Sequence, residues 1–149
     1  MLKFSVTLWV MISSSMNRFF SIALLTTVLF ALILFSRVKA HILDDVSNLM
    51  KAGNTKEISR YFASDVELTI LSQEHVSSKA QAEVILQDFF NKHHPGSVKI
   101  VHKLTSNPNL LYAVLILNTN NGVFRTSFSM KNISGKFLIT EIGIEINKD

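Results

Sequence analysis

Histidine is the side chain most often used for acid–base chemistry near neutral pH, and the chain carries five of them. One of these, His102, lies in the alternating run Val98–Leu104 and has the parity of its apolar residues. Alternate residues of a strand point to one face, so we expect His102 to face the packed side of a sheet. There it would join Tyr112, Thr126 and Thr140 in a polar group lining a ligand cavity. The other interpretation is a core histidine that is hydrogen-bonded to a carbonyl or hydroxyl group.

The remaining histidine motifs predict little chemistry. His93 and His94 are adjacent at the end of a helical stretch, and adjacent helical residues point about 100° apart, which makes joint chelation awkward. Cations near a helix C-terminus are favoured by its dipole. His41 and Asp44 have a spacing that binds metal only adventitiously. We therefore predict no catalytic residue, no metal site and no cofactor, while an enzyme remains the alternative.

The last third of the chain, Ser97 to Asn147, must position these residues. It contains four runs of alternating apolar residues, with Asn120–Gly122 at the middle turn, where a tight hairpin needs left-handed residues. The runs predict an antiparallel meander. Leu110–Leu117 is apolar on both faces, which is typical of a central strand. Gly143 lies inside the last run and predicts a bend or bulge there.

Helical spacing of apolar residues precedes this meander. We expect three helices, which begin near Ile42, Asn54 and Ser78. Gly53 fits the end of the first, and the other two begin with capping boxes. Val66–Leu71 alternates as a strand, and a short strand near His75 is left open. This order of elements predicts a single α+β domain with its helices on one face of the sheet.

Parity along the meander separates two faces. We expect the inner face to carry Phe124, Phe128, Leu138, Ile142 and Ile144. We expect the outer face to carry Arg125, Glu141 and Glu145, together with Lys99 and Lys103. Arg125 would then form a cross-strand charge pair with one of the glutamates.

The N-terminal part predicts an export signal. An apolar run, Phe19–Phe35, follows Arg18 and precedes Val38–Ala40, whose small residues suit a signal peptidase. We expect residues 1–40 to be a cleaved signal peptide, with the true start at Met16, and residues 41–149 to form the mature domain. The protein would then be periplasmic or secreted, and would touch the membrane only through this segment. The alternative is an inner-membrane anchor at residues 19–35. Without cysteine, the chain can form neither a lipoprotein anchor nor a disulfide.

The charge distribution argues against nucleic acid. The chain has 15 basic and 11 acidic residues, but four of the bases lie in residues 1–40, which contain no acid. The later part is therefore balanced, and its bases are scattered singly. A phosphate backbone requires a basic stripe, so we exclude nucleic-acid binding.

Several short motifs resemble an uncharacterised family of exported bacterial proteins, mostly from Bacteroidetes. That family is a domain of unknown function in the nuclear transport factor 2-like (cystatin-like) superfamily. The motifs are Ala52-Gly53-Asn54, Tyr61-Phe62, Ser78–Glu83, Asp88–Phe90, Lys99–His102, Asn121–Arg125 and Gly135–Ile139. The resemblance implies a cone in which a long curved sheet wraps three helices and leaves a cavity at its open end.

The superfamily includes ketosteroid isomerases, polyketide cyclases, dehydratases and non-enzymatic domains, so its fold does not select a function. An isomerase-type site would need a tyrosine on the first helix, which this chain lacks, and two inward carboxylates. We therefore expect a non-catalytic module that binds a small apolar ligand or acts in interactions at the envelope. An isomerase, dehydratase or cyclase is the alternative. The superfamily also implies a possible homodimer through the sheet.

Overall fold

The structure, a computed structural model, describes residues 23–27 and 41–148 of the 149-residue chain. The chain divides into two units, residues 1–38 and 39–149, and each is described by itself. In the first unit, residues 23–27 are helical and expose Leu24 and Leu25. The rest of the predicted signal, with Met16, lies outside the described residues. No helix within the described ranges is long and apolar enough to cross a membrane.

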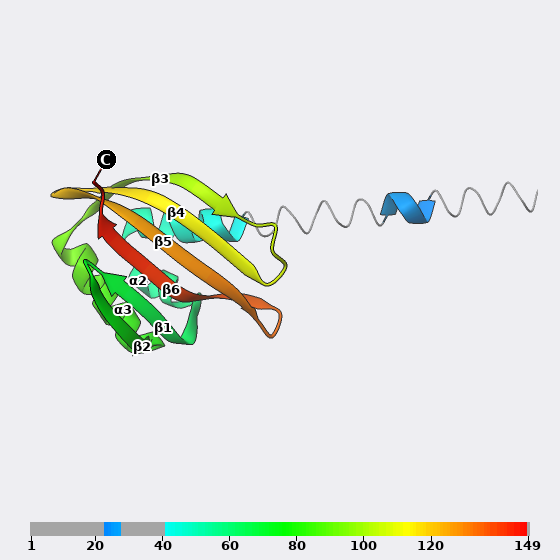
Figure 1. Ribbon diagram of the computed structural model, residues 1–149, viewed down its shortest axis with the longest axis horizontal. Coiled ribbons are helices and arrows are strands. Elements are labelled where there is room, and N and C mark those ends of the chain that lie inside the picture. The colour runs from blue at the N-terminus through cyan, green and yellow to red at the C-terminus, as the bar shows by residue number, and fades with distance from the viewer. Residues whose placement is uncertain (1–22, 28–40, 149) are drawn as a thin grey trace, which may run out of the picture. The chain divides into compact units, whose positions relative to one another are not determined.

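The second unit is built on one six-stranded sheet with the order β2-β1-β6-β5-β4-β3 (Figure 1). Its strands are β1 (Phe62–Ile70), β2 (Gln73–Ser78), β3 (Pro95–Leu104), β4 (Leu110–Thr119), β5 (Gly122–Ile133) and β6 (Lys136–Ile146). β1 and β6 are parallel, and every other neighbouring pair is antiparallel. The predicted meander is thus confirmed as β3 to β6. The strand left open near His75 exists as β2, and β1 begins at Phe62 rather than Val66.

The capping residues place the helix ends where the sequence predicts them. Residues 41–52 are helical, and Gly53 follows with a φ of +62°. α2 (Thr55–Ser59) begins where the Asn54 side chain accepts a hydrogen bond from the Glu57 N–H. α3 (Lys79–Lys92) begins with the capping box of Ser78 and Gln81. Helix α2 ends at Ser59, and Phe62 is the first residue of β1.

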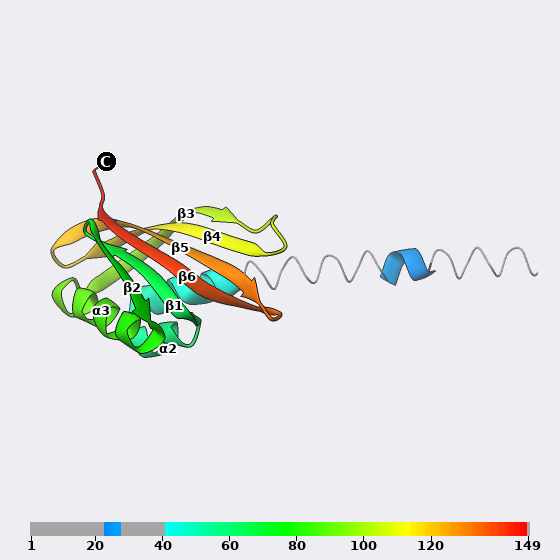
Figure 2. The same cartoon turned by 60° about the horizontal axis from the view of Figure 1, so that its bottom comes forward.

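All three helices lie against one face of the sheet, as Figure 2 shows. Apolar side chains from that face and from the helices form a single core, since burying them removes apolar surface from water. Its largest fully buried members are Leu43, Met50, Ile58, Leu68, Leu86, Leu111, Leu115, Leu117, Phe128, Met130, Ile139 and Ile142. The predicted α+β architecture, with the helices on one face of the sheet, is confirmed.

Register shifts interrupt the pairing of β1 with β6, of β3 with β4 and of β5 with β6, and two of these bulges change the faces of predicted residues. In β3, Ile100 pairs with Leu115 and His102 with Val114, which leaves Val101 as the extra residue. In β6, Ile139 pairs with Met130 and Glu141 with Ser129, which leaves Thr140 extra. An extra residue reverses the faces of all residues beyond it. Pairing continues through Gly143, so the bulge predicted there lies at Thr140 instead.

Candidate functional site

The predicted cavity residues do not form one site. His102 is exposed and Tyr112 is half-buried, and both lie on the outer face with their ring centroids 6.4 Å apart. The prediction that His102 faces the helices is wrong, because the bulge at Val101 reverses the parity of the residues that follow it.

The two threonines lie elsewhere. Thr126 is on the inner face and 1% exposed, paired with Leu115 on one side and Ile144 on the other. Thr140 is the bulge residue of β6. The Oγ1 atom of each is buried and has no hydrogen-bond partner among the described residues. Thr126 pairs with Leu115 and Ile144, whereas Thr140 lies at the bulge of β6, opposite residues nearer the other end of β5. The two hydroxyl groups therefore do not line one ligand position.

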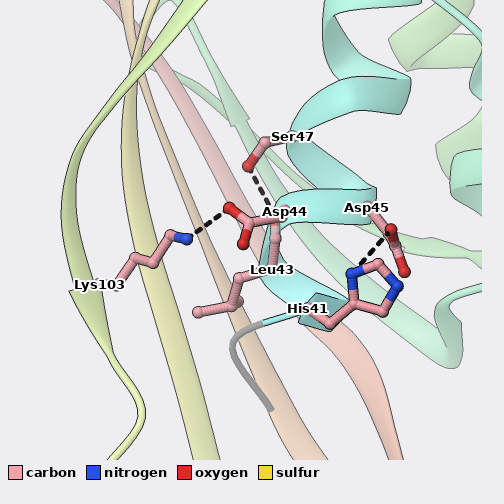
Figure 3. Close-up of polar contacts among 6 residues, drawn as sticks. All are labelled: His41, Leu43, Asp44, Asp45, Ser47 and Lys103. Carbon is pink, nitrogen blue, oxygen red and sulfur yellow. Dashed lines mark hydrogen bonds and ion pairs between the residues drawn. The ribbon is translucent and has the colours of Figure 1, made fainter. Parts of the chain in front are cut away.

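The same bulge brings Lys103 inward, against the prediction that it lies on the outer face. Its ammonium group pairs with Asp44 on the helix of residues 41–52 (Figure 3). On that helix, His41 Nδ1 lies 3.6 Å from Asp45 Oδ1, and the Ser47 hydroxyl donates to the Leu43 carbonyl. Asp44 is therefore engaged by Lys103 rather than by His41. Among the described residues, no group of three metal-binding side chains gathers.

The other face assignments are mostly confirmed. Phe124, Phe128, Ile142 and Ile144 are buried, while Arg125, Glu141 and Glu145 are exposed. Ile139 takes the inner place predicted for Leu138, because of the bulge at Thr140. Arg125 lies opposite Glu145, as predicted. Arg125 nevertheless takes part in none of the ion pairs among the described residues, so the predicted charge pair is not formed.

An open groove runs between strand β2 and helix α3, and we call it the β2–α3 groove. It has a volume of about 720 Å³. Its walls are Glu74, His75, Val76, Ser77, Ala80, Gln81, Val84 and Ile85. Val76 is 83% exposed and Val84 64% exposed. Because β2 leads directly into α3, the helix runs back beside the strand. Val84 and Ile85 of α3 form the apolar part of the channel, and Val76 lies at its β2 rim, in register with the outward Glu67.

The groove continues into a smaller hollow of about 270 Å³ near the β1–β2 turn, which shares His75 and Ile85. This hollow is lined by Ile70, Leu71, Gln73, His75, Ile85, Asp88, Phe89, Lys92 and His93. His93 is held in place, since its ring lies 4.7 Å from Phe89 and 4.8 Å from Phe124, centroid to centroid. Its Nδ1 lies 2.7 Å from Asn121 Oδ1. His93 therefore joins the end of α3 to the β4–β5 turn.

A third hollow, of about 460 Å³, also lies beside the β1–β2 turn. It is lined by Leu71, Ser72, Arg125, Glu145, Ile146, Asn147 and Lys148. Leu71 and Ser72 form the turn with φ angles of +51° and +71°.

The sequence does not predict the β2–α3 groove, because Ser72–Ser77 is polar and shows little of the apolar alternation of a strand. The available signal was the pair Val76 and Val84, which have no place in the predicted apolar faces.

Comparisons with known proteins agree with this architecture. A family model described as a domain of unknown function, DUF4783, matches residues 43–145. A solved DUF4783 family protein from Bacteroides uniformis has 28% sequence identity and a TM-score of 0.67, covering 70% of this chain and 95% of its own. One from Bacteroides ovatus has 25% identity and a TM-score of 0.67, covering 70% and 94%.

A more distant match shows the fold alone. It is a domain of unknown function with a cystatin-like fold from Nostoc punctiforme, with 9% identity and a TM-score of 0.59, covering 76% of this chain and 77% of its own. Among curated proteins, the search finds no match. The family model spans well over half of the chain, and the chain therefore belongs to the DUF4783 family, a domain of unknown function.

Proposed function

We propose that this domain is a non-catalytic binding module and that it acts in interactions through the β2–α3 groove. The observation that carries the proposal is the exposure of Val84 on α3 along an open channel of about 720 Å³, with the exposed Val76 at its β2 rim. Contiguous exposed apolar surface with a polar rim is typical of an interaction site.

The arrangement of ionisable side chains in the adjoining hollow supports binding more than catalysis. His75, Asp88, Lys92 and His93 line it, but none of them is hydrogen-bonded to another in the described part of the chain. An activated nucleophile lies within hydrogen-bond reach of its base, and that base is oriented by a third group. His93 already contacts Asn121 and two phenylalanine rings.

A neutral apolar dye tests the groove as a binding site. We expect Nile red to increase its fluorescence with the folded protein, and Val84→Glu to remove most of that increase by placing a charge in the groove. Val123→Glu is the matched control, because Val123 is also an exposed valine but lies on β5. Equal dye binding by both variants would contradict the assignment, provided that circular dichroism shows both to be folded.

An isomerase, dehydratase or cyclase is the second candidate, favoured by the four ionisable side chains around the smaller hollow. Such chemistry abstracts a proton beside a carbonyl with a carboxylate base. The test is deuterium exchange at these positions of cyclohexanone, followed by NMR. Exchange that depends on the protein and is lost in Asp88→Asn would favour the enzyme. Exchange at the buffer rate in both proteins would favour binding.

We further propose that the domain is exported and works in the periplasm or outside the cell. Phe19–Phe35, with Arg18 before it and Ala40 after it, supports a cleaved signal. Mass spectrometry of the protein recovered from the periplasm should then find His41 as its first residue. A mature protein that retains residues 19–35 would instead support the membrane anchor.

A further inference from the structure

We propose that β2 accepts an extended polypeptide segment as an additional strand, with apolar side chains toward α3 and lysine or arginine toward the outer face. This inference rests on the proposed function and names its partner. An added strand would satisfy the free backbone groups of an edge, which is a common mode of peptide recognition.

The first support is the unprotected edge itself. Among the described residues, β2 pairs only with β1, without interruption from Asp65 opposite Ser78 to Ile70 opposite Gln73. Natural sheets blunt an edge with proline, lysine or a bulge. The opposite edge, β3, has all three: Pro95, Lys99 and the bulge at Val101. β2 has none of them.

The second support is the helix beside this edge. An added strand would direct every second side chain into the β2–α3 groove, because strand residues alternate between faces. There it would meet Val84, which is 64% exposed, and the half-buried Ile85. Burying an aliphatic side chain against them is favourable by about 25 cal/mol for each Å² of apolar surface removed from water. The added strand should therefore carry apolar residues at the positions that point toward α3.

The third support is charge, which specifies the outward positions. Glu67 pairs in register with the exposed Val76, and Thr69 pairs with the exposed Glu74, so Glu67 and Glu74 lie on the outer face. Asp65 has the same parity, and neither β1 nor β2 contains lysine or arginine. In addition, Glu67 lies opposite Glu141, another exposed acid. Like charges in register destabilise a sheet, and none of these acids joins an ion pair of the described residues.

A lysine on an added strand would match this surface with both its aliphatic stem and its ammonium group. Its aliphatic stem can lie along Val76 while its ammonium group reaches the carboxylates of Glu67 and Glu74. The shallow, open channel also suits a chain better than an enclosed small molecule, which is normally buried over most of its surface. An extended segment that alternates apolar and basic residues is therefore the occupant that both faces specify.

The probe is a six-residue end-capped peptide in which lysine and valine alternate, matching the length of β2. We expect the full chain to bind it, measured by fluorescence anisotropy of the labelled peptide. The matching peptide of alternating glutamate and valine should bind at least about tenfold more weakly, because like charges would face the acids. A lysine–valine peptide with alternate backbone amides methylated on the edge-facing side should not bind.

Charge reversal in the protein supplies matched variants. Glu67→Lys combined with Glu74→Lys should weaken binding of the lysine–valine peptide about 5- to 30-fold, the effect of turning two surface attractions into repulsions. Glu145→Lys makes a similar change on the same face beside β5, and it should leave the affinity within about twofold. Thermal unfolding confirms that each variant folds.

Several outcomes overturn the inference. Equal binding of the lysine and glutamate peptides would exclude charge recognition, and full binding of the methylated peptide would exclude strand addition. Concentration-dependent self-association that is lost in the Glu67→Lys/Glu74→Lys variant would assign the edge to a second copy of the chain. If Nile red still binds in a manner that depends on Val84 while no peptide binds, only this inference fails. If neither binds, the proposed function fails as well.

Discussion

At the scale of single residues, the β1–β2 turn is held in a conformation that its residues disfavour. Leu71 and Ser72 are the two central residues and both have positive φ angles. This is the type I′ arrangement, for which asparagine and glycine are the usual residues. A residue held in the left-handed region without being glycine costs about 1–3 kcal/mol. The strained turn lies between the hollows of about 460 and 270 Å³, because Leu71 lines both of them.

We predict that Leu71→Asn combined with Ser72→Gly stabilises the domain by about 1–2 kcal/mol, because both residues adopt this turn readily. The midpoint of thermal unfolding should rise by several degrees. Ser106→Gly is the control, since Ser106 has no positive φ and should gain nothing. A lower unfolding midpoint for the double variant would show that the Leu71 side chain contributes more than its strain costs.

Gly143 illustrates a different residue-scale constraint. A Cβ atom at this position would lie 3.0 Å from the Ser127 Oγ on β5. We predict that Gly143→Ala destabilises the domain by about 1 kcal/mol and that adding Ser127→Ala recovers most of the loss. Urea unfolding of the two single variants and the double variant measures this coupling. Additive effects would mean that the two side chains do not meet.

At the scale of elements, the bulge at Val101 decides how β3 meets the first helix. It places Lys103 inward, opposite Ala113, where its ammonium group pairs with Asp44. Lys103 is partly buried, with 30% of its side chain exposed, so this pair is screened less than a surface pair. It therefore attaches the helix of residues 41–52 to the edge of the sheet.

We predict that Lys103→Met lowers the free energy of unfolding by about 0.5–1 kcal/mol, because the attraction to Asp44 is lost; the Asp44 side chain is 43% exposed and stays hydrated. Lys99→Met is the matched control on the same strand; its side chain is exposed on the outer face, and the change should stay within about 0.5 kcal/mol. Both values come from urea unfolding. Equal losses in the two variants would argue that the pair contributes nothing beyond general charge effects.

At the scale of the whole molecule, the homodimer through the sheet stays a prediction. Tyr112 and Ile116 are half-buried on the outer face of β4, on either side of the buried Val114, in register with β5 residues 125–129. We expect light scattering to give a dimer mass for the wild-type protein. Ile116→Lys should shift it to the monomer, because a charge would be placed in the contact.

Val84→Lys is the control for this dimer, since it introduces the same charge on the α3 side of the sheet and should leave the mass unchanged. A monomeric wild-type protein would remove the dimer from consideration without affecting the β2–α3 groove.

Much of this architecture was determined by the sequence alone. The helix ends at Gly53, Asn54 and Ser78 depend on neighbours within a few residues, and so does the hairpin at Asn120–Gly122; such local chemistry can be predicted from the chain. Apolar alternation likewise predicted the four-strand meander and the buried faces of Phe124, Phe128, Ile142 and Ile144. The α+β class followed from the order of these elements.

Tertiary structure alone decided which side chains meet. Alternation assigns a face only while pairing is uninterrupted, and the bulges at Val101 and Thr140 arise from the register with neighbouring strands. They therefore reversed the predicted positions of His102, Lys103 and Leu138. The β2–α3 groove depends on where a helix lies beside a strand and on which strand ends the sheet. Those are non-local properties, so a binding surface formed by Val84 on α3 and the exposed edge of β2 became apparent only in the folded chain.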